Sequence, residues 1–194
     1  MKKWIVRILT LMLAMSLSAC SCAKQPDATV GTDPTGTAAP TQPAGNEKRL
    51  TGTMVENIGR IMEKNPVEFM GATIPVDLSD TSEEGLWALK NYTGLESAER
   101  ITDVAVYEPM TGSQAFSLVL VRVKNAGDAE TVARQMKENI DPRKWICAQA
   151  DQAEVAGYGD TVMFIMVDSQ LGKTTKSYLE AFESVCGGKP DFTL

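Results

Sequence analysis

Histidine, the side chain most used for acid–base catalysis and for binding zinc, is absent from all 194 residues of the chain. Its absence excludes Ser-His-Asp and Cys-His catalysis, and it excludes zinc and copper sites that need histidine ligands. A carboxylate-only calcium site stays open, but the Asp-x-Asp-x-Asp-Gly spacing of a calcium loop is missing. Helix capping better explains the nearest acidic cluster, which contains Asp77, Asp80, Glu83 and Glu84. We predict no metal and no cofactor.

Two further patterns give only weak support for an enzyme. Gly172-Lys173-Thr174 resembles the end of a phosphate-binding loop, but Val167 stands where that motif needs a glycine. Carboxylates could pair for glycoside hydrolysis. The chain lacks the cluster of aromatic residues that sugar sites often use, and of its three tryptophans only Trp87 and Trp145 lie beyond the N-terminal apolar run. A carboxylate-based hydrolase is therefore the least favoured function.

The segment DPRKWIC, 141–147, places two cations, an aromatic residue and a cysteine together. One interpretation is a binding edge, in which Arg143 and Lys144 are the cations, Arg143 holds an anion and Trp145 is an anchor. The alternative, which we favour, is a helix-to-strand connection with Trp145 in the core.

The N-terminus has the layout of a secretory signal peptide. Lys2, Lys3 and Arg7 precede an apolar run, 8–15, and small residues lead into a cysteine. Leu17-Ser18-Ala19-Cys20 resembles the lipobox of bacterial lipoproteins, whereas Ala19 stands where Cys22 would need its leucine. We predict a signal peptide over 1–19 and lipidation of Cys20. The lipid would anchor the protein to the extracytoplasmic face of the cell membrane.

The rest of the chain is acidic and begins with a low-complexity stretch. The net charge is −6, and the first nineteen residues hold three basic and no acidic residues, so the chain from Cys20 onward carries −9. This charge argues against nucleic acid as a partner. Residues 20–46 are rich in Thr, Pro, Ala and Gly and predict a disordered tether, which leaves 47–194 as a single domain.

Cys147 and Cys186 lie in the predicted domain. An extracytoplasmic location permits a disulfide between them. Free buried thiols are the alternative, because the spacing alone does not bring the two cysteines together.

Apolar periodicity and turn residues predict four helices and four strands. The helices are expected over 51–64, 82–91 with Thr81 and Glu84 as a capping box, 128–140 with Asp128 as its cap, and 171–186; the strands are expected over 101–108, 115–124, 153–158 and 161–168. Residues 65–80 are expected to be a loop. The order α-α-β-β-α-β-β-α predicts an α+β fold, in which two hairpins joined by a helix form a mainly antiparallel four-stranded sheet. We expect helices to cover both of its apolar faces.

The stretch AGDAETVARQMKENIDPRKWIC, with the weaker NYTGL, resembles bacterial lipoproteins that carry domain of unknown function 4358. The resemblance covers roughly residues 50–186. It implies a signal, a lipobox, a spacer and one domain, and it implies no catalytic residue, substrate or cofactor.

These observations favour a non-enzymatic lipoprotein whose domain binds another envelope protein or a peptide. A small-molecule or solute-binding lipoprotein is the alternative, and it would require a concave apolar pocket with a few polar groups.

Overall fold

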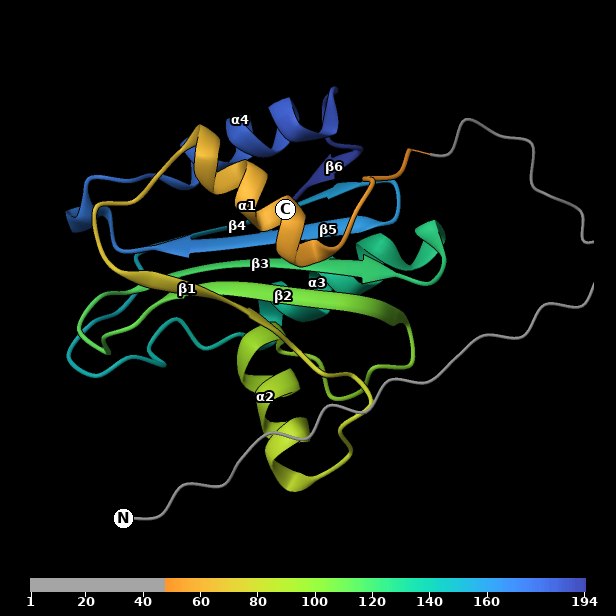
Figure 1. Cartoon of the computed structure of the whole chain (residues 1–194), viewed down its shortest axis with the longest axis horizontal. Helices are drawn as coiled ribbons and strands as arrows, with labels where there is room; N and C mark the ends of the chain where they lie inside the picture. The colour runs from red at the N-terminus through yellow and green to blue at the C-terminus, as the bar shows by residue number, and fades with distance from the viewer. Residues whose placement is uncertain (1–47) are drawn as a thin grey trace, which may run out of the picture. The chain divides into compact units, whose positions relative to one another are not determined.

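A six-stranded antiparallel sheet forms the centre of the computed structural model, which describes residues 48–194 (Figure 1). The strands run in the order β1-β2-β3-β5-β4-β6. They are β1 (Gly71–Pro75), β2 (Ile101–Pro109), β3 (Phe116–Val123), β4 (Gln152–Tyr158), β5 (Thr161–Val167) and β6 (Phe192–Thr193). The helices of this region are α1 (Met54–Lys64), α2 (Glu83–Thr93), α3 (Ala129–Asn139) and α4 (Thr175–Cys186), with short 3-10 helices η1 (Ala126–Asp128) and η2 (Ser169–Leu171). The predicted α+β class is confirmed.

The two predicted hairpins form the middle of the sheet. β2 pairs with β3, β4 pairs with β5, and β3 pairs with β5 to join the hairpins. Every residue of β3 and β5 is buried, because each strand has a neighbour on both sides and helices on both faces. Such strands appear in a sequence as continuous apolar runs, which is why FSLVLVRV and TVMFIMV are its clearest strand signals.

Helices cover both faces of the sheet, as expected, and each face has its own hydrophobic cluster. α1 and α4 lie on one face, over a cluster that includes Phe116 and Phe182. α3 and part of α2 lie on the other face, over a cluster that includes Val119 and Met136. Figure 1 shows α1 and α4 above the sheet, and it shows α2 running away from the sheet below.

The prediction of four strands is wrong in detail, because two short strands extend the sheet to six. β1 lies in the region expected to be a loop, and β6 follows α4. Their sequences, GATIP and FT, are too short to show an alternating pattern, and β1 contains the glycine and proline that strands usually avoid. Both segments become strands because they pair with β2 and β4, although their own sequences do not predict it.

All four helix starts differ in detail from the predictions. α1 begins at Met54 rather than 51, after the capping box that Thr53 forms with Glu56. α4 begins at Thr175 rather than 171, because Gly172 has a φ of 70° and Thr174 caps the helix through the Ser177 N–H at 3.3 Å. α2 is capped by Ser82 rather than Thr81. Asp128 makes no side-chain capping hydrogen bond to α3. Neighbouring polar residues compete to cap a helix, and tertiary packing selects between them.

The signal peptide predicted for 1–19, with Cys20, and the tether predicted for 20–46 lie outside the described residues. Within 48–194, none of the helices combines the length and apolar character that crossing a membrane requires.

Candidate functional site: an open sheet edge beside an exposed apolar end

The three residues of the predicted binding edge have different surroundings. Arg143 is exposed, whereas the Lys144 side chain is only 7% exposed and Trp145 is half-buried against the α3-side cluster. Lys144 forms an ion pair with Glu108 of β2, and its Nζ donates to the Asn91 carbonyl at 3.3 Å. Of the three residues, Lys144 and Trp145 thus pack against the rest of the domain, and Arg143 faces solvent.

The surroundings of Lys144 show why this cation is buried. Its Nζ lies 5.4 Å from the ring centres of both Tyr92 and Trp145, and the paired Glu108 also accepts a hydrogen bond from Ser117 Oγ at 2.8 Å. Desolvation lowers the pKa of Lys144, and the charge of Glu108 opposes that shift. The ion pair between Lys144 and Glu108 thus attaches the loop after α3 to the sheet, and each charge of the pair is balanced by the other.

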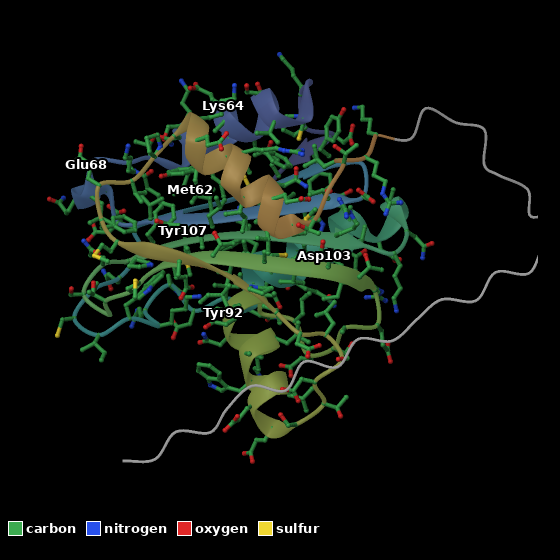
Figure 2. All side chains as sticks on the ribbon, viewed as in Figure 1. Met62, Lys64, Glu68, Tyr92, Asp103 and Tyr107 are labelled. Carbon is green, nitrogen blue, oxygen red and sulfur yellow. The ribbon has the colours of Figure 1, made fainter. Side chains whose placement is uncertain are left out.

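Three exposed apolar side chains gather where β1 and β4 begin and β2 ends. Met70, Met110 and Ile146 are 76, 67 and 77% exposed. The Met110 N–H donates to the Met70 carbonyl at 3.0 Å, and Ile146 lies over Gly112, where an added Cβ would be 3.7 Å from Ile146 Cβ. We call Met70, Met110 and Ile146 the apolar end. Figure 2 labels Glu68 near this end and Asp103 near the other.

Further exposed apolar residues lie on α2. Leu86 and Trp87 are exposed, and the ring of Trp87 meets Tyr92 edge-on at a centroid distance of 6.4 Å. Four side chains therefore form a row, in the order Trp87, Tyr92, Lys144 and Trp145. The fold thus brings together aromatic residues that are up to 58 positions apart in the sequence. In this row Lys144 already occupies the space between Tyr92 and Trp145.

The β1 strand forms one edge of the sheet, and its register determines which backbone groups are unpaired. Met70 and Val76 bond to β2, through Met110 N–H to Met70 O and Val76 N–H to Val104 O, each at 3.0 Å. In an antiparallel pair alternate residues bond to the same neighbour, so the even-numbered residues of β1 face β2. The N–H and C=O of Gly71 and Thr73 consequently point outward from the sheet.

A cavity of about 290 Å³ lies between the end of β1 and α2. Its walls include Ile74 of β1 and Ala88 and Tyr92 of α2, while its charged residues are Asp77, Asp80 and Glu84. Hydrogen bonds from Ser79 and Ser82 lower the pKa values of Asp77 and Asp80 respectively, so both carboxyl groups are ionised at neutral pH. The cavity combines an apolar wall with a negative rim.

A cluster of charged side chains at the opposite end of the sheet holds segment 48–53. The side chain of Arg122 is 10% exposed, and its Nη2 donates to the Leu50 carbonyl at 2.6 Å. Arg122 also contacts Asp103 and Asp160, at 3.8 and 3.5 Å, and Asp103 accepts the Met54 N–H at 2.9 Å. We call Arg122, Asp103 and Asp160 the charged end. This cluster fixes the start of α1 to the sheet.

The turn between β4 and β5 completes that attachment. Lys48 forms an ion pair with Asp191, whose other carboxylate oxygen accepts the Gly159 N–H at 2.8 Å. Gly159 has a φ of 56°, and a Cβ at this position would lie 1.5 Å from the Lys48 carbonyl oxygen. Only glycine therefore permits segment 48–53 to cross this turn so closely.

Cys147 and Cys186, for which the sequence left both a disulfide and free thiols open, are not bonded to each other in the structure. Both thiols are free, with Cys147 exposed and Cys186 half-buried. Cys147 follows Trp145, which packs on the α3-side cluster, whereas Cys186 packs on the α1-side cluster across the sheet. Burial raises the pKa of the Cys186 thiol to about 12. Cys20 and Cys22 lie outside the described residues.

The described residues offer little for metal or acid–base chemistry. Within 48–194, no group of three His, Cys, Asp or Glu side chains is placed to hold a metal ion. Hydrogen bonds lower the pKa values of the Asp151 and Asp191 carboxyl groups, as they do for Asp77 and Asp80. A general acid needs the opposite shift.

Comparison with known proteins gives no relative from which a role could be transferred: no family model, no curated protein and no solved structure matches the chain. The resemblance to lipoproteins with domain of unknown function 4358 stays a prediction. The site is therefore defined by its geometry alone, as an open β1 edge between the apolar end and a negatively charged cavity.

Proposed function

We propose that the protein is a lipid-anchored, extracytoplasmic lipoprotein, and that its domain binds an extended segment of another envelope protein or peptide by adding it as a strand to β1. The outward-facing N–H and C=O groups of Gly71 and Thr73 are the observation that carries this proposal. Main-chain hydrogen bonds to a sheet edge give affinity, and pockets for alternate side chains give specificity.

The composition of β1 supports strand addition. Proteins usually protect an exposed edge by keeping it very short, or with charged residues, proline or a bulge. β1 is short, with five residues, but none of the residues of GATIP is charged and the only proline is the last. Its pairing with β2 is continuous from Gly71 to Pro75. The edge is therefore open over Gly71–Ile74.

The exposed apolar residues support a macromolecular partner. Met70 directly precedes β1, and Met110 and Ile146 lie at the same end of the sheet. Of the six large apolar side chains that are exposed in the described region, three lie at this end and two lie on α2. Several exposed apolar side chains in one place mark binding surfaces more often than scattered exposure does.

The two alternative functions have less support. The cavities beside α2 measure about 290 and 210 Å³, which is at or below the lower end of the roughly 300–1,000 Å³ usual for small-molecule sites. A carboxylate hydrolase needs one carboxyl group with a raised pKa. The pKa values of Asp77, Asp80, Asp151 and Asp191 are instead lowered.

A matched pair of substitutions at Thr73 tests the proposal. Peptides are first selected against the full-length protein from a random eight-residue display library, and their binding is then measured by fluorescence anisotropy. Thr73→Pro removes the outward N–H without removing a hydrogen bond to β2, so we expect it to abolish binding. Thr73→Val keeps the N–H, so the selected peptides should bind this variant as they bind wild type.

Two results would contradict strand addition at β1. One is a library that yields no peptide enriched above background. The other is a set of peptides that bind Thr73→Pro and wild type equally, which would place the binding surface elsewhere. Hydrogen exchange gives an independent readout, because a bound strand must slow exchange at the Gly71 and Thr73 amides.

A further inference from the structure

We propose that the segment bound at β1 carries a lysine or arginine, and that this side chain fills the cavity between β1 and α2. The inference rests on the proposed function and specifies the chemistry of the partner.

The register of an added strand places one of its side chains at the cavity. Residues directly opposite each other in neighbouring strands project to the same face of a sheet. Ile74 projects to the α2 face, where it packs against the hydrophobic cluster and lines the cavity. The partner residue opposite Ile74 must therefore enter the space between Ile74 and α2. Residues opposite Gly71 and Thr73 project to the other face.

The lining of the cavity matches a long cationic side chain. Ile74, Ala88 and Tyr92 form an apolar wall that suits the aliphatic stem of lysine or arginine. The acidic residues Asp77, Asp80 and Glu84 also line the cavity, and no lysine or arginine does. The nearby cation Lys144 is neutralised by Glu108 on the far side of Tyr92 and does not line the cavity.

A second copy of this chain, paired through β1, would not supply a lysine or arginine to the cavity. Self-association through β1 would place residues from the 66–76 region of the partner copy over the cavity. That region reads PVEFMGATIPV and contains no lysine or arginine. The charge of the cavity thus favours a different, basic partner over edge-to-edge dimers.

The composition of the selected peptides provides the first test. Peptides chosen from the random library should share lysine or arginine at one fixed position. Replacing that lysine with norleucine, which keeps the stem and removes the charge, should weaken binding about tenfold, because three partly solvated carboxylates each contribute modestly.

Two α2 variants provide the matched control. Glu84→Gln removes one charge from the cavity and should weaken binding of the lysine peptide by about twofold to threefold. Glu83→Gln makes the same change one residue away, at a position that does not line the cavity, and should leave affinity unchanged. Neither variant should alter binding of the norleucine peptide.

The outcomes separate this inference from the proposed function. Peptides that depend on the Thr73 N–H but show no cationic preference would overturn the inference and leave strand addition intact. Equal affinities of lysine and norleucine peptides would do the same. Failure to select any peptide, or indifference to Thr73→Pro, would overturn both. A concentration-dependent dimer that Thr73→Pro abolishes would assign the edge to self-association instead.

Discussion

Lys144 shows how a residue that resembles a ligand-binding group can serve the fold. Its ammonium group lies between two aromatic rings and against Glu108, and its side chain is almost fully withdrawn from solvent. The adjacent Arg143 is exposed. The sequence DPRKWIC suggests two equivalent cations, but only the tertiary structure shows that one belongs to the interior.

Replacing Lys144 should therefore destabilise the domain far more than replacing Arg143. Lys144→Met leaves the carboxylate of Glu108 without its cation, and we expect a loss of about 3 kcal/mol in the free energy of unfolding. Arg143→Met should change that free energy by less than about 0.5 kcal/mol. Urea denaturation followed by circular dichroism measures both.

The double variant Lys144→Met/Glu108→Gln is the control, because it also removes the unpaired charge. It should recover part of the loss. If Lys144→Met and Arg143→Met had the same free energy of unfolding, Lys144 would not be a buried partner of Glu108.

The two described cysteines should differ sharply in reactivity. Cys147 is exposed, whereas Cys186 is half-buried with a thiol pKa of about 12, so its reactive thiolate is scarce at pH 8. In native protein carrying Cys20→Ser and Cys22→Ser, a thiol reagent should label Cys147 first and Cys186 only slowly. Adding Cys147→Ser should abolish the fast phase. A protein that takes up no reagent until it is reduced would instead contain the disulfide.

At the scale of elements, the sequence predicts those that carry a strong local pattern. Within the central hairpins β3 and β5 are apolar on both faces, and the hairpins end at recognisable turns, so all four strands are predicted within one or two residues. β1 has five residues and no alternation, and it becomes a strand only because β2 supplies its hydrogen bonds. The open edge, on which the proposed function depends, is therefore the element that local sequence could not predict.

The same limit applies to the residues of the site. Trp145 and Lys144 attract attention through their types, but the exposure of Met70 and Met110 is not encoded by type, since methionine is usually buried. The cavity forms between α2 and β1, which are joined by an irregular segment. No sequence spacing predicts that Tyr92 and Ile74 share a wall.

The turn between β4 and β5 gives a test of how elements are joined. Gly159→Ala would place a Cβ against the Lys48 carbonyl, in addition to straining a positive φ. Gly172→Ala has the same φ strain in open space and should cost about 1–2 kcal/mol of unfolding free energy. We expect Gly159→Ala to cost at least about 1 kcal/mol more.

Hydrogen exchange on both variants shows where that extra loss arises. Only Gly159→Ala should speed the exchange of amides in segment 48–53. Similar stability for the two variants would mean that segment 48–53 does not pack on the turn.

At the scale of the whole molecule, the two ends of the sheet differ in chemistry. The charged end holds segment 48–53, through which residues 1–47 join the domain, and the apolar end lies at the other ends of the same strands. β1 runs between the two ends, since Gly71 lies opposite Pro109 and Pro75 lies opposite Ala105, two residues from Asp103.

The proposed anchor depends on one cysteine. Cells expressing the wild-type chain and given an alkyne-modified palmitate should incorporate the label into the protein, and it should fractionate with membranes. Cys20→Ser should lose both the label and the membrane fraction, whereas Cys22→Ser should keep both. Label that follows Cys22, or membrane association that survives Cys20→Ser, would contradict the assignment of Cys20.

The contacts of segment 48–53 also determine how the domain would respond to mechanical tension. Tension applied through the N-terminal side enters at Lys48, which is attached by an ion pair and side-chain contacts and not by a strand. Contacts of this kind break one after another, and this takes less force than breaking the hydrogen bonds of a sheet all at once. Stretching would therefore detach segment 48–53 before the force reached the sheet. β1 would then keep its shape and its bound segment.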